Sequence, residues 1–124
     1  MALHKELSIY KQAYDLLSFA VDINRNIPRD MKMALGNRIR DECVNIMILV
    51  SRANAIRDMP ARVPLIDQII ERNEVSAILF RLLNDKKFIS SGQFSKSIEL
   101  TDCLGKQATG WKDSCCVPRP KLER

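Results

Sequence analysis

Three short breaks divide the sequence into four stretches with the apolar periodicity of amphipathic helices, and this pattern restricts the fold more than any other feature. The breaks lie at Pro28, around Pro60 and Pro64, and at residues 84–87. Proline ends a helix because the residue before it avoids helical backbone angles. No stretch of convincing length alternates apolar and polar residues as a half-buried strand would. The chain is therefore expected to be all-α.

The four predicted helices span about residues 3–26, 30–57, 64–84 and 90–112. Their predicted core-facing stripes are Leu3, Leu7, Tyr10, Tyr14, Leu17 and Val21; Leu35, Ile39, Cys43, Ile46, Val50 and Ala53; Ile66, Ile69, Ile70, Asn73, Ala77 and Phe80; and Ile98, Thr101, Leu104, Ala108 and Trp111. Because the connections are short, neighbouring helices are expected to run antiparallel, as an up-down-up-down four-helix bundle. Residues 1–113 are expected to form this domain and residues 114–124 a flexible basic tail.

Two helix starts have recognisable caps. Asp30 can cap the second helix. Ser90 and Gln93 have the spacing of a capping box, in which each side chain accepts a hydrogen bond from the other's backbone N–H. Ile89 and Phe94 flank this box as a hydrophobic staple.

The stretch GKQATGWK, residues 105–112, looks at first like a phosphate-binding loop. Such a loop needs G-x-x-x-x-G-K-[ST] between a strand and a helix. Leu100 stands where the first glycine is needed and Gln107 where the hydroxyl residue is needed, so we exclude this type of site. Gly105 is instead expected to let a neighbouring helix approach. Gly110 suits a helix C-terminus, but Trp111 continues the apolar stripe, which indicates a helix that runs a turn further.

Trp111 is expected to seal one end of the bundle. Its flanking cations, Lys106 and Lys112, would then be left in solvent or facing a polyanion.

Groups for catalysis or metal binding are scarce. His4 is the only histidine, and the four cysteines, of which Cys115 and Cys116 are expected in an exposed tail, lack metal-ligand spacing. The carboxylates are expected at solvated positions: Asp41, Glu42, Glu71 and Glu74. We therefore predict no enzyme, no metal and no cofactor.

Neither a membrane span nor an export signal is expected. The longest strictly apolar run, residues 46–50, is too short to span a bilayer. The first residues, MALHKELSIYK, carry charges where a signal peptide needs apolar residues. The cytoplasm is the expected compartment.

The formal net charge is +5, and residues 25–62 hold eight cations and four anions. Arg38, Asn45 and Arg52 are spaced seven apart and so line one helix face. Arginine suits phosphate because its guanidinium donates two parallel hydrogen bonds. The same residues are equally compatible with outer faces that only keep the protein in solution. With few aromatic residues between the cations, stacking on single-stranded bases is not supported, and contact with the backbone is the expected mode.

The patterns IPRDMKMALGNRIRDECVNIMILVSRAN, AILFRLLNDKKFISSGQF and LGKQATGWK occur in this order over most of the chain. Together they resemble the accessory variability determinant proteins of diversity-generating retroelements, across about residues 7–112. More distantly, the chain is similar to four-helix proteins encoded in intervening sequences of ribosomal RNA genes.

The resemblance implies a four-helix protomer assembled into a basic pentameric barrel. Such proteins bind the reverse transcriptase of their element and its template RNA or cDNA, and support mutagenic retrohoming without being the polymerase. The basic positions expected to bind are Arg81 above all, then Lys86, Lys87, Arg72, Arg38, Arg52, Arg25 and Arg29.

The second helix is apolar on nearly every side around residues 44–50, so this part must be central or covered by another subunit. With the resemblance, we expect Val44, Met47, Ile48 and Leu49 to meet a neighbouring subunit. Two other functions remain open: an RNA-binding helical protein associated with ribosomal RNA, or a purely structural oligomerisation domain.

Overall fold

The computed structural model describes residues 8–116; residues 1–7 and 117–124 lie outside the described part. Its elements are α1 (Ser8–Asn24), the 3₁₀ turn η2 (Arg29–Met31), the π-helical turn η3 (Lys32–Gly36), α2 (Asn37–Ala55), the 3₁₀ turn η4 (Met59–Arg62), α3 (Val63–Asp85) and α4 (Ser91–Cys116). Residues 8–116 contain no strand, and four long helices dominate. The predicted all-α class is confirmed.

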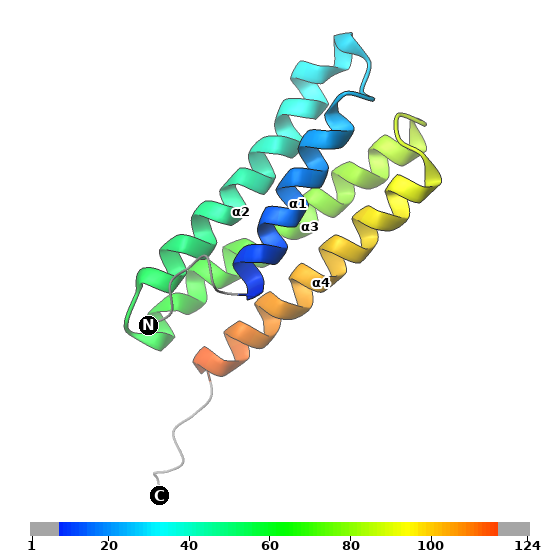
Figure 1. Cartoon of the computed structure of the whole chain (residues 1–124). Helices are drawn as coiled ribbons and strands as arrows, with labels where there is room; N and C mark the ends of the chain where they lie inside the picture. Colours follow the sequence, from blue (N-terminus) through cyan, green and yellow to red (C-terminus); the bar gives the residue numbers. More distant parts are fainter. Residues whose placement is uncertain (1–7, 117–124) are drawn as a thin grey trace, which may run out of the picture.

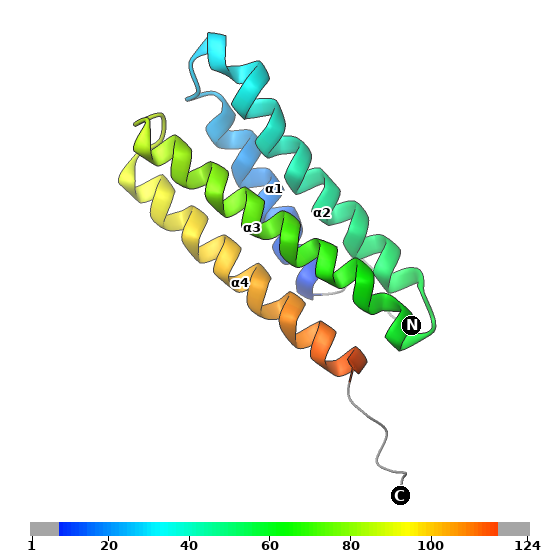
Figure 2. The same ribbon diagram turned by 180° about the vertical axis from the view of Figure 1, so that it is seen from behind.

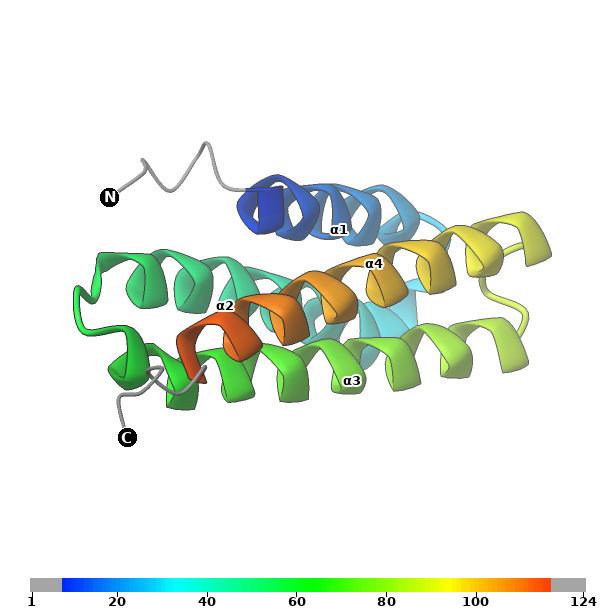
Figure 3. The same ribbon diagram turned by 90° about the horizontal axis from the view of Figure 1, so that it is seen from below.

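The helices run antiparallel and form a bundle in which each packs beside the next along the chain (Figures 1 and 2). In the view from below, α4 also lies beside α1, which closes the bundle (Figure 3). The α1–α2 and α3–α4 connections lie at one end of the bundle. The α2–α3 connection and the end of α4 lie at the other (Figure 1). No helix within residues 8–116 is long and apolar enough to cross a membrane.

The core draws fully buried side chains from all four helices, among them Leu16, Ile46, Phe80 and Leu104. The Phe80 ring meets Phe19 of α1 edge-on across the bundle, with centroids 5.6 Å apart. Such a contact favours one relative placement of α1 and α3 because the ring edge and face carry opposite partial charges. Core contacts therefore set the relative positions of the diagonal helices α1 and α3 as well as those of neighbouring helices.

The predicted core stripe of α1 is wrong by one position. The buried residues are Ile9, Ala13, Leu16, Ala20 and Ile23, whereas Tyr14 and Val21 are 57% and 51% exposed. The buried stripe includes two alanines, which let α1 pack closely but give a weaker apolar pattern than tyrosine and valine. Two parallel apolar stripes therefore run along α1, and only one faces the core. The predicted Leu3 and Leu7 lie outside the described residues.

The second helix also starts differently from the prediction. Asp30 lies inside the 3₁₀ turn η2 and caps no helix; the chain then widens into one π-helical turn before α2. At the end of this turn Gly36 is buried, and a Cβ there would lie 2.6 Å from Asn24 Oδ1. A side chain at residue 36 would force the Asn24 carboxamide to move, so glycine favours this close approach to the end of α1. This close contact, which pattern analysis does not detect, shapes the connection.

The start of α4 agrees with the prediction. The Ser90 backbone N–H donates to Gln93 Oε1 at 2.9 Å, and the Gln93 N–H donates to Ser90 Oγ at 3.0 Å. Ile89 is buried beside this turn, and Phe94 packs against the core. The capping box is therefore confirmed.

The far end of α4 corrects other expectations. The helix passes through Gly110 without ending and continues to Cys116, beyond the predicted boundary at residue 113. Cys115 is buried in its last turn, so only Cys116 of the pair is exposed. Ile98, predicted for the core, is 45% exposed, while Thr101, Leu104 and Ala108 are buried as predicted.

Trp111 packs partly buried against the core, as expected for a residue near the bundle's end. Lys112 remains partly in solvent, with its side chain 37% exposed, and it also has a partner: its Nζ lies 2.8 Å from Asp67 Oδ1, and this hydrogen bond raises the pKa of Lys112. The pair joins the last turns of α4 to the first turns of α3. Gly105 faces α3, where a Cβ would touch Asn73 Nδ2 at 3.4 Å, so the predicted close approach of a neighbouring helix is present.

Replacing Ser90 by alanine is expected to destabilise the protein by about 1 kcal/mol, because the Gln93 backbone N–H loses its acceptor, Ser90 Oγ. The free energy of unfolding from denaturant titration measures this change. Ser95→Ala, at an exposed position inside α4, is the matched control and is expected to change stability by less than about 0.5 kcal/mol. Equal losses in both variants would contradict a stabilising role of the cap.

Candidate nucleic-acid interface

One buried carboxylate joins two of the predicted binding arginines. Glu42 of α2 is only 3% exposed. Its Oε2 accepts a hydrogen bond from Arg38 Nε at 2.8 Å, one helical turn earlier. From α3, Arg72 Nη1 donates to both oxygens of the same carboxylate, at 3.1 and 3.0 Å. The expectation that Glu42 is solvated is therefore wrong.

This arrangement leaves a positive charge at the surface. A carboxylate out of water needs compensating charge and hydrogen bonds, and two guanidinium groups supply both. The side chain of Arg38 is 54% exposed and that of Arg72 is 31% exposed, so each still presents donors to solvent. The cluster ties α2 to α3 and holds the guanidinium of Arg72 in one place. A preoriented guanidinium binds an anion with a smaller loss of side-chain entropy.

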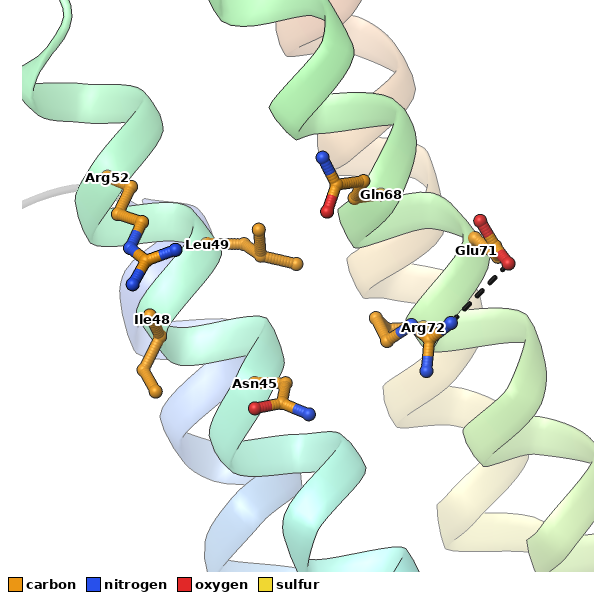
Figure 4. Close-up of a pocket in the computed structure, with 7 residues that line it drawn as sticks. All are labelled: Asn45, Ile48, Leu49, Arg52, Gln68, Glu71 and Arg72. Atoms are coloured by element: carbon orange, nitrogen blue, oxygen red, sulfur yellow. Dashed lines mark hydrogen bonds and ion pairs between the residues drawn. The ribbon is translucent and has the colours of Figure 1, made fainter.

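A groove of about 360 Å³ between α2 and α3 continues from this cluster (Figure 4). Its lining residues are Asn45, Ile48, Leu49, Arg52, Gln68, Glu71 and Arg72. The lining thus contains two guanidinium groups, two side-chain amides and a single carboxylate, that of Glu71. Glu71 Oε2 lies 3.4 Å from Arg72 Nη2. The groove is net positive and rich in hydrogen-bond donors, which is what a phosphodiester backbone requires.

Asn45 and Arg52 of the predicted row line this groove, and Arg38 is linked to it through the Glu42 carboxylate that also holds Arg72. Sequence reasoning missed the buried Glu42 and, in the groove itself, Gln68. Glu42 sits three residues after buried Ile39 and four after Arg38, and this spacing could have indicated a buried carboxylate paired along the helix. Gln68 carries no such signal in the sequence.

The other predicted cations lie elsewhere. Arg25 and Arg29 are exposed in the α1–α2 connection, and Lys86 and Lys87 are exposed in the α3–α4 connection, at the same end of the bundle (Figure 1). Arg81, on α3, is 77% exposed and lies 3.9 Å from Asp85. It is nine residues from Arg72, so the two side chains leave α3 on opposite sides. They do not share one surface of the protomer.

Lys87 adopts φ 63°, the only positive φ among the described residues other than glycine. Its N–H bonds to Asn84 O, and the next N–H, of Phe88, bonds to Leu83 O, which is the pattern that ends a helix at a left-handed residue. Glycine is the usual residue there because a Cβ in this conformation costs about 1 kcal/mol. Lys87 therefore places an exposed cation on a turn that two backbone hydrogen bonds hold.

The predicted oligomer residues lie on two sides of α2. Val44, Met47 and Ile48 border a shallow apolar groove of about 400 Å³ between α1 and α2, opposite Tyr10 and Leu17 of α1. Leu49 is 8% exposed and points from α2 toward α3 (Figure 4).

No catalytic arrangement accompanies these surfaces within the part of the chain that the structure describes. Residues 8–116 contain no group of three or more metal-ligating side chains. The Cys43 thiol is fully buried, and desolvation raises its pKa to about 12, so the thiolate that attacks a substrate is not formed near neutral pH.

Replacing Glu42 by glutamine is expected to lower the free energy of unfolding by about 1–3 kcal/mol. The change leaves Arg38 and Arg72 without the charge that compensates them and removes charged hydrogen bonds. Chemical denaturation measures the loss. Asp41→Asn, at the exposed neighbour of Glu42, is the control and should stay within about 0.5 kcal/mol of the parent protein. A change of similar size in the two variants would show that the buried carboxylate has no special role.

The sequence was also compared with known proteins. No curated protein matches it. A family model described as bAvd-like, which represents bacterial accessory variability determinants, matches residues 7–115. The match spans all four long helices and nearly the whole described range. This family consists of accessory proteins of diversity-generating retroelements that are not themselves the catalytic component. The chain therefore belongs to the bAvd-like family of accessory variability determinants.

Proposed function

We propose that this protein is the accessory subunit that brings the reverse transcriptase of a diversity-generating retroelement together with its template RNA or cDNA, and so supports mutagenic retrohoming. Family membership supports the retroelement context. The observation that carries the binding function is the groove between α2 and α3, which Arg52 lines from α2 and Arg72, held by buried Glu42, lines from α3.

The groove is proposed to bind the nucleic-acid backbone. Two arginines can hold adjacent phosphate oxygens, while Asn45 and Gln68 add neutral donors that bind sugar or phosphate equally well. The groove lacks aromatic side chains on which bases could stack. Binding is therefore expected to tolerate many sequences and to weaken steeply with salt.

The predicted cations that lie outside the α2–α3 groove are proposed to bind the polymerase or a second part of the same nucleic acid. Arg81, Lys86, Lys87, Arg25 and Arg29 form this set, and all are exposed. Their separation from the α2–α3 groove means that one protomer has two basic regions. A protein with two such regions can hold two partners at once, which is what an accessory subunit of a polymerase needs.

Assembly into a ring, with a pentamer as the family-based expectation, is proposed to use the apolar face between α1 and α2. Val44, Met47 and Ile48 lie there opposite Tyr10 and Leu17 of α1. Leu49 of the predicted set is left out because it packs in the core. An exposed apolar surface of this kind is typical of a contact between subunits.

Arg52→Gln is expected to weaken binding of the template RNA and to reduce the salt dependence, because one phosphate contact is lost. The slope of log K against log salt should fall by about 0.7–0.9, the value for one counterion released. Fluorescence anisotropy with labelled template RNA at several salt concentrations measures both quantities.

Arg57→Gln changes the net charge equally at an exposed position just after α2, outside the groove, and serves as the control. Its slope should match that of the parent protein. Identical losses in both variants would mean that only net charge matters and that the α2–α3 groove is not the binding site.

Ile48→Lys is expected to disrupt assembly, because it places a charge in the apolar α1–α2 face. Sedimentation velocity at micromolar concentration should show a shift from oligomer to monomer, with the helical circular dichroism unchanged. Ile78→Lys is the matched control, since Ile78 is a 67% exposed isoleucine on α3. A parent protein that sediments as a monomer would remove the assembly proposal altogether.

A further inference from the structure

The guanidinium and carboxamide groups of the α2–α3 groove alternate between its two helices (Figure 4). Arg52 of α2 lies at the level of Gln68 of α3, and Arg72 of α3 lies at the level of Asn45 of α2. The two levels are about 6–10 Å apart along the groove, because Gln68 and Arg72 are four positions apart on α3 and Asn45 and Arg52 seven on α2. Each level therefore carries one guanidinium and one carboxamide.

Both carboxamides are accessible to a ligand. Asn45 and Gln68 are exposed, and neither side chain forms a hydrogen bond with another residue of the described range 8–116. A carboxamide has an acceptor, its carbonyl oxygen, in addition to the N–H donors that a guanidinium also has. As donors the two amides do not distinguish sugar from phosphate, but as acceptors they do, because a phosphodiester has no hydrogen to donate. The groove thus offers two acceptors that phosphate cannot use.

Apolar side chains lie between the two levels of the groove. Ile48 and Leu49 of α2 occupy this middle part (Figure 4). A phosphate beside an apolar surface loses hydration without gaining a partner, whereas the C–H groups of a ribose ring have little hydration to lose. The described residues that line the groove include no aromatic side chain, so bases are not held by stacking and the sugar–phosphate side of a strand faces the protein. The middle of the groove therefore suits a sugar.

We propose that Asn45 and Gln68 bind 2′-hydroxyl groups of an RNA strand whose phosphates lie on the two arginines, so that the groove selects RNA over DNA. A 2′-hydroxyl both donates and accepts a hydrogen bond, as a carboxamide does, and it is the group that distinguishes RNA from DNA. Each nucleotide of RNA repeats one phosphate and one hydroxyl, and each level of the groove repeats one guanidinium and one carboxamide. A DNA strand offers the two carbonyl oxygens no donor. This inference rests on the proposed binding of nucleic acid and names the strand that the groove takes.

The test measures fluorescence anisotropy of the full-length chain with three labelled single strands of one sequence that cannot pair with itself. The strands are RNA, DNA and 2′-O-methyl RNA, the last of which keeps the sugar conformation of RNA but has no hydroxyl hydrogen to donate. The parent protein is expected to bind RNA about tenfold more tightly than DNA, the difference that two neutral hydrogen bonds of ordinary strength produce. The methylated strand should bind as weakly as DNA.

Matched variants locate the recognition of the sugar. Asn45→Ala and Gln68→Ala are each expected to weaken RNA binding about threefold and to change DNA binding less than about twofold, so that the double variant loses most of the preference. Asn26→Ala removes the same carboxamide from the α1–α2 connection, outside the groove, and should keep the preference. These three positions are exposed, so the variants should fold. Arg52→Met should weaken RNA and DNA binding by the same factor, because both strands carry the phosphates.

Two results would overturn this inference and leave the proposed function standing. The first is equal affinity of the parent protein for RNA and DNA, with Arg52→Met weakening both, which would mean that the groove binds phosphate whatever the sugar. The second is a preference for RNA that the methylated strand shares or that the double variant keeps, which would mean that the two amides do not bind the hydroxyl groups. No binding of any strand at low salt would instead overturn the proposed function, and this inference with it.

Discussion

The hydrogen bonds between Glu42 and two arginines are the interaction on which the candidate interface depends. A carboxylate that is 3% exposed needs partners of opposite charge that replace its bonds to water, and Arg38 and Arg72 supply them from two different helices. This requirement fixes where α2 and α3 lie along one another. It also gives Arg72 its place in the groove. The same bonds thus contribute to both the fold and the proposed binding of nucleic acid.

The third helix separates two surfaces with opposite chemistry. One side of α3 carries Gln68 and Arg72 into the basic groove with α2. Its other side carries Asn73 and Glu74 into a groove with α4 whose lining holds three carboxylates and one amine. Adjacent residues on a helix point about 100° apart, so a single turn can serve both grooves. The buried stripe of isoleucine, phenylalanine and leucine on α3 is narrow, and polar residues with different partners flank it on both sides. The amphipathic pattern of this helix is therefore weak.

The sequence was sufficient for the features that depend on local chemistry. The fold class, the four long helices and the Ser90–Gln93 cap follow from periodicity and spacing, and the structure confirms them. The sequence was insufficient where two faces of one helix had similar apolar patterns. The outer stripe with Tyr14 and Val21 is more apolar than the alanine-containing stripe that the core buries, and only packing with the other helices decides between them. The burial of Glu42 depends in the same way on Arg72, thirty residues later.

The two stripes of α1 also connect assembly with binding. A chain that needed only its own core would gain nothing from exposed apolar side chains such as Tyr14 of α1 and Ile48 of α2. Ile48 and Arg52 line both the apolar α1–α2 groove and the basic α2–α3 groove. A subunit that covered Ile48 would exclude water next to the Arg52 guanidinium and strengthen its attraction for phosphate, since charges interact more strongly where the local dielectric is lower. Assembly through the first groove is therefore expected to increase affinity in the second, without any change in the conformation of the protomer.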